Sequence, residues 1–126
     1  MMNRTVETEN APAPIGPYSQ AVWAGNTLYM SGQIAINPES GELVMDSIQS
    51  ETQQVMRNIE AVLNEANLDF TKVIKCSIFL SDMNLFAEVN EIYGSFFSGN
   101  YPARETLEVS KLPKAVNVEI SVIAVR

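Results

Sequence analysis

The chain has 126 residues, 46% of them hydrophobic, so a single domain with a substantial core is expected over 1–126. It contains no histidine, which removes the usual general base near neutral pH and the Ser-His and Cys-His nucleophile pairs. A formal net charge of −7 disfavours nucleic-acid binding, and no stretch predicts a signal peptide or membrane span. We therefore expect a soluble cytoplasmic protein.

The first third of the chain predicts an extended arm and a β-hairpin. Three prolines and a glycine within 11–17 exclude regular structure there. Strand-like runs at 18–23 and 28–31 flank Ala24-Gly25-Asn26, which has the turn residues of a hairpin. A third apolar run, 34–36, is expected to be strand-like as well.

An amphipathic helix is predicted from Asp46, because apolar residues then recur every three or four positions. The stripe consists of Ile48, Thr52, Val55, Met56, Ile59, Val62, Leu63 and Ala66. Asp46 followed by Gln49 resembles a capping box, and Asn67 is the expected terminator. The opposite face is expected to be solvated and carries Glu51, Arg57, Glu60 and Glu65.

A strand at 73–80 and a second helix are predicted next. The apolar side of the strand holds Ile74, Cys76, Ile78 and Leu80, so the single cysteine is expected to be a small core residue rather than a nucleophile. A lone cysteine supports neither an intramolecular disulfide nor a zinc site. Asp82 or Asn84 can cap the helix, whose stripe is Phe86, Val89, Ile92, Tyr93, Phe96 and Phe97.

The last third returns to a period of two. Arg104 and Thr106 share one strand face, and in the final strand the residues from Val116 to Ala124 alternate between apolar and mixed sides. The order β-β-β-α-β-α-β-β predicts an α+β domain with a mixed sheet whose two helices cover one face.

The uncovered face of this sheet is predicted to be partly apolar. It carries Ile123, Val125 and either Val22 or Met30. Such a face usually meets another subunit. We expect a homo-oligomer with pockets at the subunit boundaries.

Arg104 and Glu119 are the main candidates for chemistry, because they can face each other across a sheet. Arg104 can clamp a substrate carboxylate with two hydrogen bonds, or form a structural ion pair with Glu105, Glu108 or Glu119. Glu119 interrupts an apolar strand, so it can orient or deprotonate a water, or act as the counter-ion of Arg104.

Four further residues have both a structural and a functional interpretation. Tyr18, after a Gly-Pro turn, can stack on a ligand or cover the core. Ser31 and Gly32 can offer a hydroxyl and a backbone N–H to an oxyanion, and the glycine can equally mark a β-bulge or a close approach to the backbone. Asn90 can donate to a neighbouring strand or remain solvated.

Several segments together resemble the reactive intermediate deaminase family, also called the Rid or YjgF family. They are Glu9–Gln20, Ser31–Ile34, Val89-Asn90 and, most specifically, Pro102-Ala103-Arg104 through Leu112-Pro113-Lys114 to Val118-Glu119-Ile120. The resemblance implies a chorismate-mutase-like α+β fold assembled as a homotrimer with three inter-subunit clefts. It also implies hydrolysis of enamines and imines such as 2-aminoacrylate to 2-oxo acids and ammonia, without a metal or organic cofactor.

The resemblance also implies roles for individual residues. Arg104 would bind the substrate carboxylate with help from the Gly32 N–H, and Glu119 would position the attacking water. Tyr18 would line the cleft, and its wall would be completed by Ser31, Asn90 and Thr106. The alternative is a regulatory module that binds a 2-oxo acid or amino acid without turnover; a ribonuclease is disfavoured by charge.

Glu105 departs from the family pattern, in which the residue after the arginine is small or apolar. Alternation along the strand predicts that Glu105 lies on the face opposite Arg104. There the carboxylate would need a partner such as Lys72 or Lys75.

Overall fold

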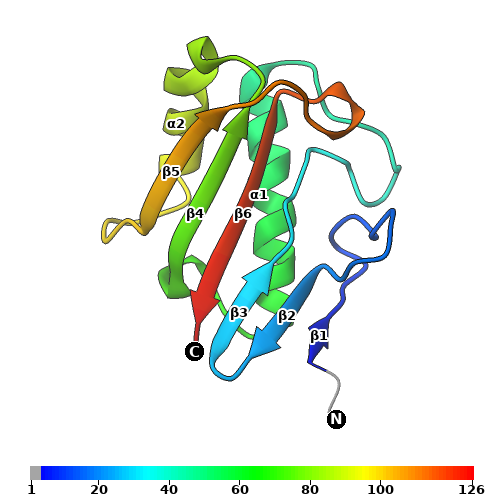
Figure 1. Cartoon of the computed structure of the whole chain (residues 1–126), viewed down its shortest axis with the longest axis vertical. Coiled ribbons are helices and arrows are strands. Elements are labelled where there is room, and N and C mark those ends of the chain that lie inside the picture. Colours follow the sequence, from blue (N-terminus) through cyan, green and yellow to red (C-terminus); the bar gives the residue numbers. More distant parts are fainter. Residues whose placement is uncertain (1–3) are drawn as a thin grey trace.

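The computed structural model describes residues 4–126; the first three residues, part of the segment in which no signal peptide was expected, lie outside it. Six strands form one mixed sheet in the order β1-β2-β3-β6-β4-β5, and α1 and α2 cover one of its faces (Figure 1). Among the strands of residues 4–126, only β4 and β5 pair in parallel. The strands are β1 (Thr5–Val6), β2 (Ala21–Ala24), β3 (Thr27–Met30), β4 (Val73–Leu80), β5 (Ala103–Glu108) and β6 (Val118–Val125). The predicted α+β class with two helices on one face is confirmed.

The long helix α1 (Ile48–Glu65) has its N-cap one residue after the predicted position, Asp46. Its N-cap is Ser47, whose hydroxyl accepts from the Ser50 N–H, while the Ser50 hydroxyl accepts from the Ser47 N–H. The expected Asp46 cap is therefore wrong, because the serine pair supplies the capping box. Asn67 follows the helix with φ 60°, as a terminator should.

The prediction that Glu51 lies on the solvated face of α1 is wrong, because this residue is fully buried. Both of its carboxylate oxygens accept hydrogen bonds from the start of β6: from the Asn117 N–H at 2.8 Å, the Asn117 side-chain amide at 2.8 Å and the Val118 N–H at 3.2 Å. Glu51 thus joins the N-terminal turn of α1 to β6.

The shorter helix α2 (Phe86–Gly94) follows a 3-10 turn, Met83–Leu85. Asp82 caps this turn by accepting from the Asn84 N–H, so it caps the helix only indirectly. The predicted stripe extends past the helix end, because Phe96 and Phe97 pack against Phe70 with ring centroids 5.5 Å and 5.3 Å away.

The hairpin of β2 and β3 is confirmed, with Gly25 at φ 61° in its turn. The run 34–36 is not a strand; Ile36 makes only a bridge to Leu43. The first strand is instead β1, which precedes residues 11–17 and was not predicted. A strand of two residues is too short to show an alternating pattern in the sequence. It is defined by its pairing with β2 and not by its local sequence.

The two sheet faces differ as predicted. The residues facing the helices are buried and include Leu28, Met30, Cys76, Ile78, Leu80, Val118, Ile120, Val122 and Ala124. The open face carries Val22, 41% exposed, and Tyr29, 51% exposed, so of the two alternatives Val22 lies there and Met30 does not. Ile74 also turns outward, because irregular pairing at Val73/Lys75 gives the core position to Val73. Within residues 4–126, no helix is both long and apolar enough to span a bilayer.

Candidate active site

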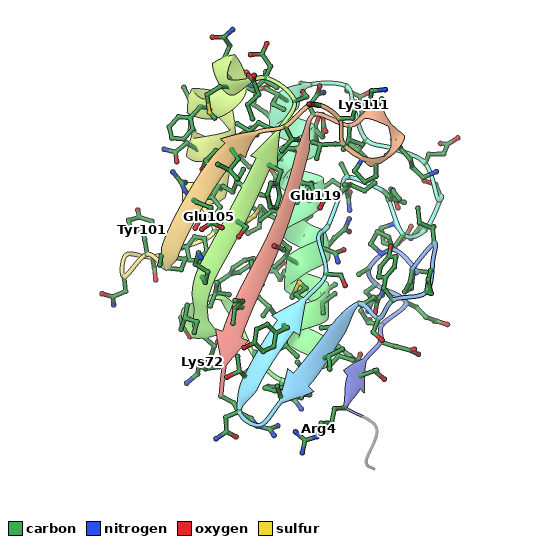
Figure 2. The ribbon with its side chains drawn as sticks, viewed as in Figure 1. Arg4, Lys72, Tyr101, Glu105, Lys111 and Glu119 are labelled. Carbon is green, nitrogen blue, oxygen red and sulfur yellow. The ribbon has the colours of Figure 1, made fainter. Side chains whose placement is uncertain are left out.

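Arg104 and Glu119 lie on opposite faces of the sheet. Strand β4 separates β5 from β6, with Arg104 paired to Cys76 and Glu119 paired to Phe79. Figure 2 labels Glu119 on β6 and Glu105, the residue after Arg104, on β5. Positions 76 and 79 are an odd number of residues apart, so their side chains point to opposite faces. The expectation that Arg104 and Glu119 face each other is therefore wrong within one chain.

The Arg104 guanidinium has no anionic partner among the described residues. Its Nη1 donates to Asn90 Oδ1 at 2.7 Å, and its Cζ lies 5.1 Å from the Tyr93 ring centroid and 5.5 Å from that of Phe86. The group opens onto a shallow cavity of about 750 Å³ between α2 and the start of β5. This basic group is held by neutral contacts, which leaves its charge available to an incoming anion.

The ion pairs considered for Arg104 are absent from residues 4–126, because its acidic neighbours are engaged elsewhere or lie on the other face. Glu105 lies on the open face, where Lys75 Nζ approaches its Oε1 at 2.9 Å and the Ser77 hydroxyl donates to Oε2. These contacts lower the pKa of Glu105, with the Ser77 hydrogen bond the larger cause. The Lys75 alternative is thus confirmed. Glu108 accepts from the Met83 N–H at 2.8 Å.

Beneath Arg104 lie three polar groups with little contact to solvent. Cys76 is fully buried, and burial raises the pKa of its thiol, as expected for a core residue. The pKa of Tyr93 is raised, mainly by burial and to a smaller extent by the neighbouring Cys76 thiol, so its hydroxyl stays protonated. The Thr106 hydroxyl is buried without a hydrogen-bond partner among residues 4–126, and the buried Tyr93 hydroxyl neighbours the Cys76 thiol. Thr106 does not line the cavity onto which Arg104 opens.

Glu119 lies in a second cavity, of about 370 Å³, between the arm and the sheet. Much of the wall is apolar; the lining is Pro12, Ala13, Ile15, Tyr18, Gln20, Ser31, Gly32, Gln33, Ile34, Ile36, Pro113 and Glu119. The Glu119 carboxylate is half-buried and has neither an ion pair nor a hydrogen bond to the described residues. Burial raises its pKa.

Gly32 brings the backbone against this carboxylate. A Cβ at position 32 would lie 2.8 Å from Glu119 Cδ, closer than such atoms approach. The predicted close approach is therefore confirmed. The Gly32 N–H makes no hydrogen bond within residues 4–126 and is available to a ligand.

Tyr18 and Ser31 complete one side of this cavity. Tyr18 is 49% exposed, so it does not cover the core, and its hydroxyl accepts from the Ile15 N–H at 3.4 Å. The Ser31 hydroxyl donates to the Ser19 carbonyl at 2.6 Å and keeps only its lone pairs for a ligand. The structure thus groups Tyr18, Ser31, Gly32 and Glu119 in one place and Asn90 and Arg104 in another.

Gln20 and Asn58 support the cavity, and neither was predicted from the sequence. Gln20 is 2% exposed and holds the arm: its Oε1 accepts from the Thr8 N–H at 2.7 Å, and its Nε2 donates to the Thr8, Ala11 and Pro12 carbonyls. Asn58 donates to the carbonyls of Ile34 and Ile36, both at 3.0 Å. The helical period could have revealed Asn58, which lies on the α1 stripe; no local signal marks Gln20.

The amino-acid sequence matches a family model and several known proteins. The endoribonuclease L-PSP family model matches residues 8–126. A RutC family protein of Pyrococcus horikoshii is 50% identical over 123 residues, which cover 98% of each chain. The human 2-iminobutanoate/2-iminopropanoate deaminase is 43% identical over 126 residues, covering 100% of this chain and 92% of the human protein.

A comparison with solved structures indicates the same family. A protein of the conserved Rid family from Yersinia pestis superposes with a TM-score of 0.96 at 48% identity, covering 99% of this chain and 100% of the other. Sequence and structure thus match over almost the whole chain. The chain belongs to the endoribonuclease L-PSP family, which is the Rid or YjgF family that its sequence resembles.

Proposed function

We propose that the protein is a deaminase that hydrolyses 2-imino acids, and enamines such as 2-aminoacrylate, to 2-oxo acids and ammonia. The observation that carries the proposal is the pair of unpartnered groups of opposite charge: an arginine without a carboxylate and a half-buried glutamate without a donor. The activity named for the human relative supports the same reaction.

In the proposed reaction Arg104 binds the substrate carboxylate and the Gly32 N–H donates a further hydrogen bond. Glu119 takes a proton from a water whose oxygen attacks C2 of the imine. Return of this proton to the nitrogen gives a carbinolamine, with one hydroxyl and one amino group on C2. Glu119 then passes the hydroxyl proton to the amino group, the C–N bond breaks, and ammonia leaves as the 2-oxo acid forms. An enamine first tautomerises to the imine by gaining a proton at C3 and losing one from nitrogen. An imine carbon is already electrophilic, so orientation of the water supplies much of the acceleration and no covalent nucleophile is needed.

We further propose that the working site is shared between subunits of a homotrimer. Arg104 and Glu119 point away from each other in one chain, so the two can meet around one substrate only if a neighbour supplies the other half. The apolar part of the open sheet face, with Val22 and Tyr29, supports such an assembly.

The remaining residues are assigned supporting roles in this site. Asn90 holds the Arg104 guanidinium, and Tyr18 forms a wall beside Glu119. Ser31 fixes the loop through its bond to Ser19, with Gly32 as the next residue. The Thr106 hydroxyl lacks a hydrogen-bond partner among residues 4–126, so we assign it to the cleft wall.

The test is the release of ammonia and 2-oxo acid from enzymatically generated 2-aminoacrylate, above the uncatalysed background. Arg104→Ala should lower kcat/KM on the order of 100-fold, because the carboxylate clamp is lost. Glu119→Ala should lower it about 10²- to 10⁴-fold, as expected for loss of a general base. Both variants should keep the wild-type oligomeric state by light scattering.

Either of two results would contradict the proposal. An Arg104→Ala protein with wild-type activity would exclude the clamp. A folded wild-type protein that binds 2-oxobutanoate by calorimetry without accelerating hydrolysis would be a small-molecule binding module instead.

A further inference from the structure

Phe86 and Tyr93 both place an aromatic ring against the Arg104 guanidinium. The distance from Arg104 Cζ to the ring centroid is 5.5 Å for Phe86 and 5.1 Å for Tyr93. Both lie within the range in which a guanidinium is attracted to the face of a ring. Arginine, with its flat and weakly hydrated head group, suits such a contact better than lysine.

These two rings and Asn90 form one stripe along α2. Phe86, Asn90 and Tyr93 are spaced four and three residues apart, the spacing that brings side chains to the same side of a helix. In Figure 1, α2 lies beside β5, the strand that carries Arg104. One helix face therefore supplies three contacts to a single guanidinium.

All three contacts are electrically neutral. A carboxylate would hold the guanidinium equally firmly but would cancel its charge and compete with a substrate anion. Two rings and an amide oxygen restrict its motion and leave the charge in place. Tyr93, only 4% exposed, is itself fixed in the core, so its ring is a rigid support.

We propose that Phe86 and Tyr93 are positioning residues: they hold the Arg104 guanidinium in the orientation that accepts the substrate carboxylate before the substrate arrives. The inference rests on the proposed function, since it assumes that Arg104 binds a carboxylate. Its consequence is a gain in affinity, because the ordering of the guanidinium is completed in the free protein.

Steady-state kinetics on an imine substrate test the inference through KM. Phe86→Leu and Tyr93→Leu should each raise KM about three- to tenfold, the effect of leaving one long side chain to be ordered by the ligand. The value of kcat should change less than about twofold, because a carboxylate contact is equal in the ground and transition states. Calorimetric Kd values for 2-oxobutanoate should rise by the same factor.

Conservative variants separate positioning from folding. Phe86→Tyr and Tyr93→Phe keep the rings and should keep the wild-type KM. Phe96→Leu is the matched control, since Phe96 packs on Phe70 with a centroid distance of 5.5 Å and has no contact with Arg104. It should leave KM unchanged.

An unchanged KM and Kd in both leucine variants would overturn the inference, as would a fall in kcat alone. Failure of the proposed function is a separate result, because the wild-type protein would then show no hydrolysis at all. In that case the 2-oxobutanoate Kd values still test the orientation of Arg104.

Discussion

At the residue scale, Gly32 limits the space available to Glu119. Its φ is not in the left-handed region, so alanine is compatible with the backbone, but the added Cβ would displace the Glu119 carboxylate. Gly32→Ala should therefore lower kcat about 10- to 100-fold, since small misplacements of a reacting group have effects of this size. The urea midpoint should stay within the experimental error, and a stable variant with full kcat would contradict this role for Gly32.

The ionised form of Glu119 is expected to be needed for activity and, at the same time, to lower the stability of the fold. Burial raises its folded pKa above the ordinary value of 4.5, so the folded protein binds the proton more tightly than the unfolded chain. Ionisation of Glu119 then destabilises the fold at pH values above the raised pKa, and this cost disappears below about 4.5. Glu119→Gln should therefore be inactive and more stable than wild type at pH 7.

The measurement is the urea midpoint of wild type and Glu119→Gln at pH 7 and at pH 4, at matched protein concentration. The advantage of the variant should vanish at pH 4. In the wild type, kcat/KM should fall as the pH drops through the raised pKa, because the base becomes protonated. A glutamine variant less stable than wild type at pH 7 would show that the carboxylate stabilises the fold.

At the element scale, the arm that walls the Glu119 cavity depends on one side chain. Gln20→Ala removes the bonds to Thr8, Ala11 and Pro12 and leaves arm groups unpaired, which costs about 1–3 kcal/mol. We expect faster hydrogen exchange in residues 8–12 and a higher KM. Gln49→Ala is the matched control, because Gln49 is exposed on α1. Equal exchange in both variants would exclude this role for Gln20.

Helix α1 shows which features of an element the hydrophobic period predicts and which it does not. Its extent and apolar stripe follow from the sequence. Glu51 lies on that same stripe, four residues before Val55, but its charge suggested a solvated position. Its true surroundings come from Asn117 and Val118, distant in sequence, whose N–H groups meet it only in the folded chain. Local patterns cannot supply partners of this kind.

At the scale of the whole molecule, the sequence predicted the layers of the fold and not the relation of its two reacting groups. Alternation correctly placed Arg104 and Glu105 on opposite faces. It could not reveal that β4 inserts between β5 and β6, so the faces of Arg104 and Glu119 could not be compared. Strand order is a long-range property, and it determines here that Arg104 and Glu119 lie on opposite faces of one chain.

Mixed assemblies test whether these halves are shared. Arg104→Ala and Glu119→Ala chains, each strongly impaired alone, should regain activity when co-assembled, because some neighbours then combine an intact Arg104 with an intact Glu119. Random mixing in equal amounts should restore about one quarter of the wild-type rate in a head-to-tail ring. Two variants that form hybrid oligomers without any recovery would place the whole site within one chain.

The opposed faces of Arg104 and Glu119 also have a consequence for dilution. If neither half acts alone, specific activity is a property of the assembled state and should fall as the chains dissociate. A newly synthesised chain would have no deaminase activity until it assembles with other copies. Substitutions on the open sheet face, at Ile74 or Leu107 for example, would then resemble active-site lesions in a screen although they touch no substrate.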